Sequence, residues 1–103
     1  MDWKSRWSVE HPDTGALEAA LRAEGFAAYR WTGRPGSAYL DYIHDSDEVV
    51  CVLSGTADVK VADETGTVGA GDRMDVPANT RHSITVTGTE PLVVLTGMRS
   101  SRH

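Results

Sequence analysis

The sequence predicts an all-β fold, an antiparallel sandwich or small barrel with one short N-terminal helix. After Gly25 the chain consists of short runs rich in Val, Tyr, Ile and Thr in which apolar and polar residues alternate, the pattern of half-buried strands. Gly, Pro or a turn-favouring acid separates these runs, and no long helical segment lies between them to return a strand in parallel. The chain has 103 residues, 40% of them apolar, which is enough for one compact core, so a single domain is predicted.

The N-terminal quarter is predicted to be an arm followed by the helix. The first twelve residues contain Trp3 and Trp7 among polar residues, which indicates an arm packed against the body of the protein. The helix is expected over about residues 14–24, where apolar side chains fall at helical spacing and alanine is frequent. Either Asp13 or Thr14 can accept hydrogen bonds from the free amides of its first turn.

Eight strands are predicted after the helix, at a spacing of roughly 8–10 residues that is typical of a sandwich or barrel. They cover Phe26–Thr32, Ala38–His44, Glu48–Leu53, Ala57–Ala62, Thr65–Val68, Arg73–Val76, His82–Thr87 and Leu92–Gly97. Closure of these strands into a barrel would hide the sheet edges. The expected organisation is therefore an arm and helix over residues 1–25, a β barrel over 26–98 and a flexible polar tail over 99–103.

Composition excludes several classes of protein. Ten Lys plus Arg against 15 Asp plus Glu give a net charge of −5 without a basic stripe, which argues against a nucleic-acid partner. No apolar run approaches the roughly 18 residues that a membrane helix needs, and the N-terminus lacks the apolar core of a signal peptide, so a cytoplasmic location and no membrane partner are expected. Cys51 is the only cysteine, which excludes an internal disulfide and a thiolate cluster. The expected partner is a small molecule.

Three residues from separate segments form the strongest candidate site: His44, Glu48 and His82. His44 ends one predicted strand, Glu48 begins the next, and His82 opens a third after a turn that contains proline. If the faces that carry them line the interior, two imidazoles and one carboxylate converge with coordination positions left open. Such a set binds divalent iron, manganese, nickel or zinc. The metal-free alternative is a pair between a protonated histidine and the carboxylate.

The spacing around two of these residues resembles the first motif of the cupin family, G-x5-H-x-H-x(3,4)-E-x6-G. The stretch from Gly36 to Gly55 matches it at His44, Glu48 and both glycines. Tyr42 stands where the first histidine of the family's pair would be. A phenol can ligate iron(III), can hydrogen-bond a metal-bound water or can fill space, so both the metal and its occupancy stay open.

The stretch from Gly71 to His82 resembles most of the second cupin motif, G-x5-P-x-G-x2-H-x3-N. Asn79, a residue that also tolerates left-handed dihedral angles, replaces the internal glycine, and Val86 replaces the final asparagine. Together the motifs cover about a third of the chain, and the neighbouring strands extend the resemblance over about residues 29–97. The resemblance implies the cupin barrel, a jelly roll built as an antiparallel double-stranded β-helix.

Cupins include dioxygenases, isomerases and lyases, so the resemblance implies a metalloprotein that acts as an enzyme of oxygenase or isomerase/lyase type on a small organic molecule. His44, Glu48 and His82 would hold the divalent metal, and Tyr42 would act as a general acid or orient the substrate. A role for Glu48 as a base without metal is the less favoured catalytic alternative. The other alternative is a metal-free cupin, or one with a vestigial site, that serves as a small-molecule binding or sensor module.

Five further side chains are candidates for contact with a ligand. Arg73 and Arg81 flank the second motif and could clamp a substrate carboxylate in bidentate fashion, although ordinary surface arginines are commoner. The rings of Tyr29, Trp31 and Tyr39 could line the mouth of a cavity and stack on a planar ligand, or pack in the barrel core.

The resemblance also implies a homodimer. Cupin barrels of this size often associate through an outer sheet face or an exchanged N-terminal strand. Trp3 and Trp7 are the expected contacts between the two copies.

Overall fold

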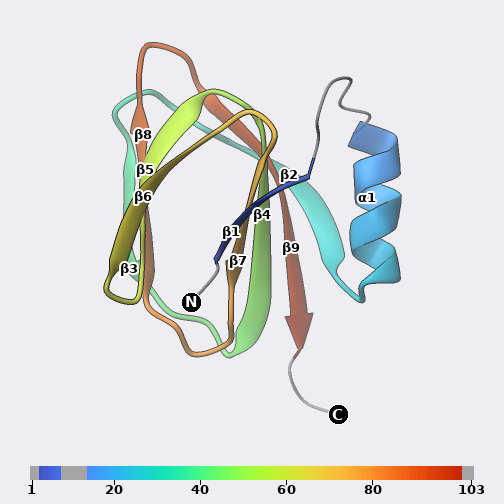
Figure 1. Cartoon of the computed structure of the whole chain (residues 1–103). Coiled ribbons are helices and arrows are strands. Elements are labelled where there is room, and N and C mark those ends of the chain that lie inside the picture. The colour runs from blue at the N-terminus through green and yellow to red at the C-terminus, as the bar shows by residue number, and fades with distance from the viewer. Residues whose placement is uncertain (1–2, 8–13, 101–103) are drawn as a thin grey trace.

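The computed structural model describes residues 3–7 and 14–100, and it confirms the predicted all-β fold (Figure 1). In chain order the elements are β1 (Lys4–Arg6), α1 (Thr14–Ala23), β2 (Ala27–Gly33), β3 (Ala38–Tyr42), β4 (Ser46–Ser54), β5 (Thr56–Val61), β6 (Glu64–Gly69), β7 (Asp72–Val76), β8 (His82–Thr87) and β9 (Leu92–Ser100). One sheet has the strand order β1-β7-β4-β9-β2 and the other β3-β8-β5-β6. All the strand pairs are antiparallel, and the two sheets face each other as the walls of a barrel.

The main core fills the space between the two sheets. Its buried members are Trp3, Val50, Val52, Ala57, Val59, Val61, Val68, Met74, Val76, Val86, Leu92 and Val94. Strands β5 and β7 alternate strictly between buried residues and more exposed ones, as the period-two sequence pattern predicts. Burial of one face of each strand therefore sets which side chains point into the barrel.

Strand β4 is buried on both of its faces. Val50 and Val52 point into the barrel core, whereas Val49 and Cys51 lie on the outer face of the five-stranded sheet, beneath α1 and its side chain Leu21. A strand covered on both sides has a continuous apolar sequence, which explains the run VVCVL. Burial raises the pKa of the Cys51 thiol to about 12, so this cysteine is an inert packing residue.

Residues 4–6 of the N-terminal arm form a strand that the sequence did not predict, because they pair with β7 as strand β1. Trp3 is only 7% exposed and packs in the barrel core, against Gly66. The indole of Trp7 donates a hydrogen bond of 3.0 Å to the Val52 carbonyl. The expected dimer contact through Trp3 is thus replaced by packing within the chain. Of the two residues that could cap the helix, Thr14 is the first residue of α1, and Asp13 lies outside the described residues.

The last strand is longer than predicted, since β9 continues through residues 99 and 100, which were expected to belong to the flexible tail. Arg99 pairs in register with Asp47, makes an ion pair of 3.3 Å with it and places its guanidinium over the Phe26 ring. These contacts explain why the strand extends past its apolar segment. Residues 101–103 of the predicted tail lie outside the described residues. In the part of the chain that is described, no helix has the length and hydropathy needed to cross a membrane.

Candidate metal centre

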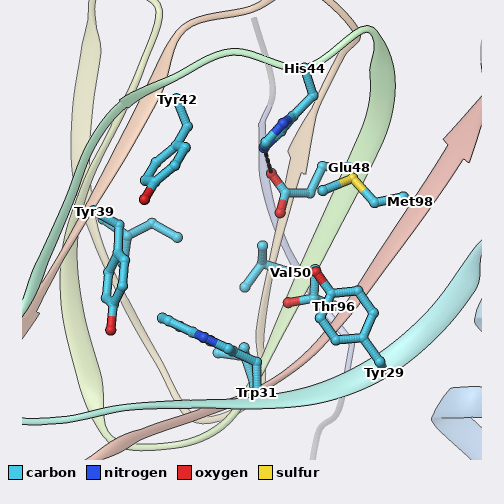
Figure 2. Close-up of a pocket in the computed structure, with 11 residues that line it drawn as sticks. Tyr29, Trp31, Tyr39, Tyr42, His44, Glu48, Val50, Thr96 and Met98 are labelled. Atoms are coloured by element: carbon cyan, nitrogen blue, oxygen red, sulfur yellow. Dashed lines mark ion pairs between the residues drawn. The ribbon is translucent and has the colours of Figure 1, made fainter.

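His44, Glu48 and His82 come from three different segments and meet at one end of the barrel. Glu48 lies on β4 in the five-stranded sheet, His82 is the first residue of β8 in the other sheet, and His44 lies in the link between β3 and β4. The Oε1 atom of Glu48 is 2.8 Å from Nε2 of His82 and 3.7 Å from Nε2 of His44. The two imidazole ring centres are 5.1 Å apart. Figure 2 shows His44 and Glu48 directed toward each other.

Two hydrogen bonds hold the His44 link against the turn that precedes His82. The backbone N–H of Asn79 donates to the carbonyl of His44 at 2.6 Å, and the N–H of Ala78 donates to the Asp47 carboxylate at 2.9 Å. Asn79 has a φ of 62°, in the left-handed region, which explains why this position accepts glycine or asparagine. The turn geometry therefore sets the distance between the two histidines.

The cluster is buried, and most deeply at His82. The exposed fractions of the side chains are 4% for His82, 10% for Glu48 and 33% for His44. Nδ1 of His82 lies 3.0 Å from the carbonyl oxygen of Thr80, which can only accept, so this nitrogen carries the proton. The tautomer of a neutral His82 therefore leaves the Nε2 lone pair facing Glu48.

Glu48 Oε1 is a buried atom without a hydrogen bond of acceptable geometry among the described residues. The nearest nitrogen, Nε2 of His82, is 2.8 Å away and carries no proton in the neutral tautomer, so it can pair with this oxygen only when His82 is protonated. Two imidazole nitrogens converge on this one carboxylate oxygen, an arrangement that a cation could occupy as readily as a proton shared with a histidine.

The geometry fits a first-row transition metal ion. The donor atoms of the three residues all lie within 4.8 Å of one another. Ligand bonds of about 2.0–2.2 Å place neighbouring ligand atoms about 3–3.5 Å apart, and the distances of 2.8 and 3.7 Å from Glu48 Oε1 to the two histidines fall on either side of this range. Two imidazoles and one carboxylate suit iron, manganese, nickel or zinc. The donor set and the unpaired oxygen therefore support a possible metal site.

In the absence of a metal, Glu48 also favours the protonated form of His82. Burial acts against the charged imidazolium, but the Glu48 carboxylate and the Thr80 carbonyl outweigh burial and raise the pKa of His82 above its ordinary value. The site can thus hold either a divalent cation or a proton on His82 beside Glu48.

A cavity of about 310 Å³ opens next to the cluster (Figure 2). Its walls come from β2, β3, β4, β8 and β9, and they consist of Tyr29, Trp31, Tyr39, Tyr42, His44, Glu48, Val50, Ile84, Val94, Thr96 and Met98. The rings of Tyr29, Trp31 and Tyr39 therefore line the cavity, as one of the two sequence interpretations has it. Burial and the charge of Glu48 raise the pKa of Tyr29.

Tyr42 lies beside the cluster, because it is the residue of β3 that pairs with His82 of β8. Its ring stacks on His44 with the ring centres 6.1 Å apart, and 48% of the residue is exposed. The hydroxyl points into the cavity, on the side where Tyr39 lies (Figure 2). Tyr42 is thus placed to contact a molecule in the cavity.

The two arginines that the sequence singles out do not line this cavity. Arg73 pairs in register with Cys51 on the outer face of the sheet, where it makes ion pairs of 2.9 Å with Glu24 and 3.0 Å with Asp75. Arg81 is exposed in the connection between β7 and β8. A substrate carboxylate in this cavity would therefore meet neither guanidinium.

Sequence reasoning missed five residues that line the cavity: the apolar Val50, Ile84 and Val94, and also Thr96 and Met98. Thr96 is 4% exposed and shares the inner face of β9 with Leu92 and Val94. A polar residue in an otherwise apolar alternating set was the available signal. Met98 of β9 pairs with Glu48 of β4, and it lies one residue past the predicted end of its strand at Gly97.

Comparison with known proteins identifies the family and the fold. Residues 29–98 match the sequence model of the family described as "Cupin domain". No protein with curated annotation matches the chain significantly. The protein TT1209 from Thermus thermophilus superposes with a TM-score of 0.65 at 23% identity, covering 89% of this chain and 98% of that one.

Two further solved structures have the same fold. The cupin domain of Schizosaccharomyces pombe Cnp3 gives a TM-score of 0.71 at 18% identity, covering 95% of this chain and 60% of that one. A Thermotoga maritima protein described as a predicted oxalate decarboxylase gives 0.66 at 19% identity, covering 94% of this chain and 78% of that one. At these identities the likeness concerns the fold alone.

Proposed function

This chain belongs to the cupin family, and we propose that it is a metal-dependent enzyme of oxygenase or isomerase/lyase type that acts on a small organic molecule. The observation that carries the proposal is the buried Oε1 atom of Glu48, which faces two imidazoles without an aligned hydrogen bond. A buried carboxylate oxygen without a hydrogen bond is costly, and a bound cation would offset that cost. The adjoining cavity leaves room for a substrate beside the ion.

The position of each side chain suggests its role. His44, Glu48 and His82 would hold the ion, which would supply Lewis acidity or, for iron or manganese, redox chemistry. The Thr80 carbonyl keeps the proton on Nδ1 of His82 and so presents Nε2 to the site. Tyr42, whose hydroxyl points into the cavity, would orient the substrate or donate a proton to it.

The second candidate is a metal-free binding or sensor module, and the raised pKa of His82 favours it. In this alternative a protonated His82 pairs with Glu48 at 2.8 Å and the cavity binds a ligand without reaction. The two candidates differ in what occupies the space among the three side chains, so metal content distinguishes them.

The test is metal uptake by protein purified with a chelator, then loaded in turn with iron(II), manganese, nickel or zinc, dialysed and analysed by mass spectrometry of the elements. One ion per chain is expected for at least one of these metals. Glu48→Gln and His82→Ala should lose the ion, whereas Glu90→Gln, at an exposed position outside the cluster, should keep it. Absence of uptake with all four metals would refute the metalloenzyme, and uptake retained in His82→Ala would refute the ligand assignment.

Turnover needs its own measurement. Native mass spectrometry of the freshly purified protein can retain a ligand from the expression host. The proposal expects the metal-loaded protein to convert that ligand and the chelated protein to leave it unchanged. A ligand that binds stoichiometrically to the metal-loaded protein and is never converted would refute the enzyme, and equal binding to the chelated protein would favour the metal-free module.

We also propose that the protein forms a homodimer. β3 is an edge strand of the four-stranded sheet, and Leu40 and Ile43, on and just after it, are 60% and 55% exposed. Burial of these side chains against a second copy would stabilise an interface. Light scattering should report twice the chain mass, with Leu40→Lys shifting the protein to the monomer. Only the monomer mass at working concentration would refute the dimer.

A further inference from the structure

We infer that the cavity beside the His44, Glu48 and His82 cluster selects flat, uncharged aromatic molecules over anionic ones. The inference rests on the proposed function, since it names the class of substrate for the same site. It follows from the charge, the shape and the size of the cavity walls, and from the position of the few polar groups among them.

The described residues that line the cavity include no lysine or arginine that could neutralise an acidic ligand. Among them only Glu48 is an acid and only His44 is a base. Two nearby arginines are held elsewhere: Arg73 by acids on the outer sheet face, and Arg99 by Asp47. An ionised carboxylate placed among these walls would lose its hydration without gaining a lysine or arginine partner, which is costly. A bound divalent ion would keep a net charge of +1 beside Glu48, so the selectivity inferred here is that of the protein walls, and it is tested without the ion.

The opposite wall is built from aromatic rings in a fixed arrangement. Trp31 on β2 and Tyr39 on β3 make an edge-to-face pair, with ring centres 4.8 Å apart and planes inclined by 76°. This geometry is the favourable one for two aromatic rings, and it holds the indole in one orientation. Figure 2 shows both rings on the side of the cavity away from His44 and Glu48.

Gly33 gives the indole the space for this orientation. A Cβ atom at Gly33 would lie 3.1 Å from Cη2 of Trp31 and 3.1 Å from a methyl carbon of Val86. The indole therefore lies over a strand position without a side chain, and its six-membered ring extends along the cavity wall. A flat wall of this kind stacks on a flat ligand.

The size of the cavity limits the ligand to a small one. Its volume of about 310 Å³ is at the lower end of the roughly 300–1,000 Å³ range of ligand pockets, so one ring or two fused rings fit. Val50, Ile84 and Val94 supply apolar contacts, whereas Tyr42 and Thr96 supply hydroxyl groups. The best match is an aromatic ring system that carries a hydroxyl or carbonyl group directed toward the histidine cluster.

A matched pair of probes tests the class: 2-naphthol, which is uncharged at pH 7.5, and 2-naphthoate, which has the same rings and a carboxylate. Binding of each to chelator-treated full-length protein is measured by equilibrium dialysis with absorbance detection. The naphthol is expected to bind at least tenfold more tightly. Equal affinities, tighter binding of the naphthoate, or no detectable binding of the naphthol would overturn the inference.

Substitutions then test the aromatic wall. Trp31→Leu should weaken naphthol binding at least tenfold, and Trp31→Phe should restore most of the affinity. Trp7→Phe is the matched control, because Trp7 does not line the cavity and should leave binding unchanged. Circular dichroism confirms folding of each variant. Unchanged affinity in a folded Trp31→Leu protein would overturn the assigned wall, and Tyr39→Leu gives a second test if Trp31→Leu does not fold.

The outcome is separable from that of metal binding, because the probe experiment runs without metal. Selective naphthol binding by a protein that takes up no ion would refute the metalloenzyme and support the ligand class. Metal uptake by a protein that does not distinguish the probes would support the metal site and refute the ligand class.

Discussion

Replacing the Glu48 carboxylate by its amide should stabilise the metal-free protein once the pH is above the raised pKa of His82, which the experiment approaches at pH 8. The Oε1 atom is buried without an aligned hydrogen bond, and a neutral His82 does not compensate its charge. Glu48→Gln keeps the shape of the side chain and removes the charge. Relief of one unsatisfied buried group is expected to raise the free energy of unfolding by about 1–3 kcal/mol. For a domain of this size the Tm should rise by roughly 5 °C or more.

The same substitution should abolish stabilisation by metal. In the wild-type protein an ion present at about 100 times its Kd adds about 2.7 kcal/mol to the free energy of unfolding. That increment corresponds to a rise in Tm of roughly 10–20 °C. Glu48→Gln removes the carboxylate ligand of the three-residue set, so its Tm should be the same with and without metal.

The effect on the metal-free protein should reverse in acid. Burial disfavours the imidazolium of His82, but Glu48 and the Thr80 carbonyl outweigh it and raise the pKa of His82. The resulting stability is fully present below the ordinary value of 6.5 and is lost as the pH rises through the raised value. Two unit charges 2.8 Å apart attract by about 6 kcal/mol at an effective dielectric constant of 20 before desolvation is counted. Removing one partner at pH 5.5 should therefore cost about 3 kcal/mol.

Urea unfolding at pH 5.5 and pH 8, with chelator and with saturating metal, measures all three effects. Glu90→Gln is the control for loss of an exposed carboxylate. Destabilisation of similar size at both pH values would refute the reasoning, because Glu48 would then have to be satisfied by neutral partners. A metal-induced rise in Tm that survives in Glu48→Gln would equally refute it.

Four further outcomes are expected. Tyr42→Phe should keep the full metal content and lose turnover of the ligand, and loss of the ion would identify Tyr42 as a ligand instead. The pKa of Glu24 is lowered by its hydrogen bonds to Arg73, so this pair stabilises the fold above pH 4.5 and less as the pH falls through the lowered value. Glu24→Gln should accordingly cost about 0.5 kcal/mol in urea unfolding at pH 7 and less at pH 3, and an equal cost at both would contradict the ion pair. With a pKa of about 12, Cys51 should not react with Ellman's reagent at pH 8 until the protein unfolds, and fast reaction of the folded protein would contradict its burial. Asn79→Ala should cost about 1 kcal/mol because φ is 62°, whereas Asn79→Gly should be nearly neutral, and the reverse order would refute the left-handed turn.

The barrel was predictable because apolar and polar residues alternate along most of its strands. Strand β1 was not predictable, because it has no such alternation. Three polar residues, Lys4 to Arg6, carry no periodic signal, and their pairing with β7 depends on backbone hydrogen bonds and on Trp3 entering the core. A tryptophan near the N-terminus is equally consistent with a core residue and with a contact between chains. Only the tertiary fold shows that Gly66 leaves the space beneath its ring.

The sequence spacing predicted the three residues that come together as candidate metal ligands. It also suggested that Arg73 contacts the substrate, but Arg73 does not line the cavity. Arg73 lies near the start of the second motif, so the sequence places it close to the site. Its side chain faces outward because β7 pairs with β4 in the register that sets Met74 opposite Val50 and Arg73 opposite Cys51. Alternation along a strand gives two faces, and the partner strand determines which of them is the interior.

Glu48 is a charged residue at a buried position where the pattern of the strand calls for an apolar one. Along β4 the inward-facing set continues as Val50 and Val52, and a third valine in place of Glu48 would complete an apolar face without a buried charge. The apolar contacts on both faces of β4 do not require an acid at this position. The proposed metal site would explain it, because the carboxylate is predicted to destabilise the metal-free barrel above the raised pKa of His82 and it faces two imidazoles.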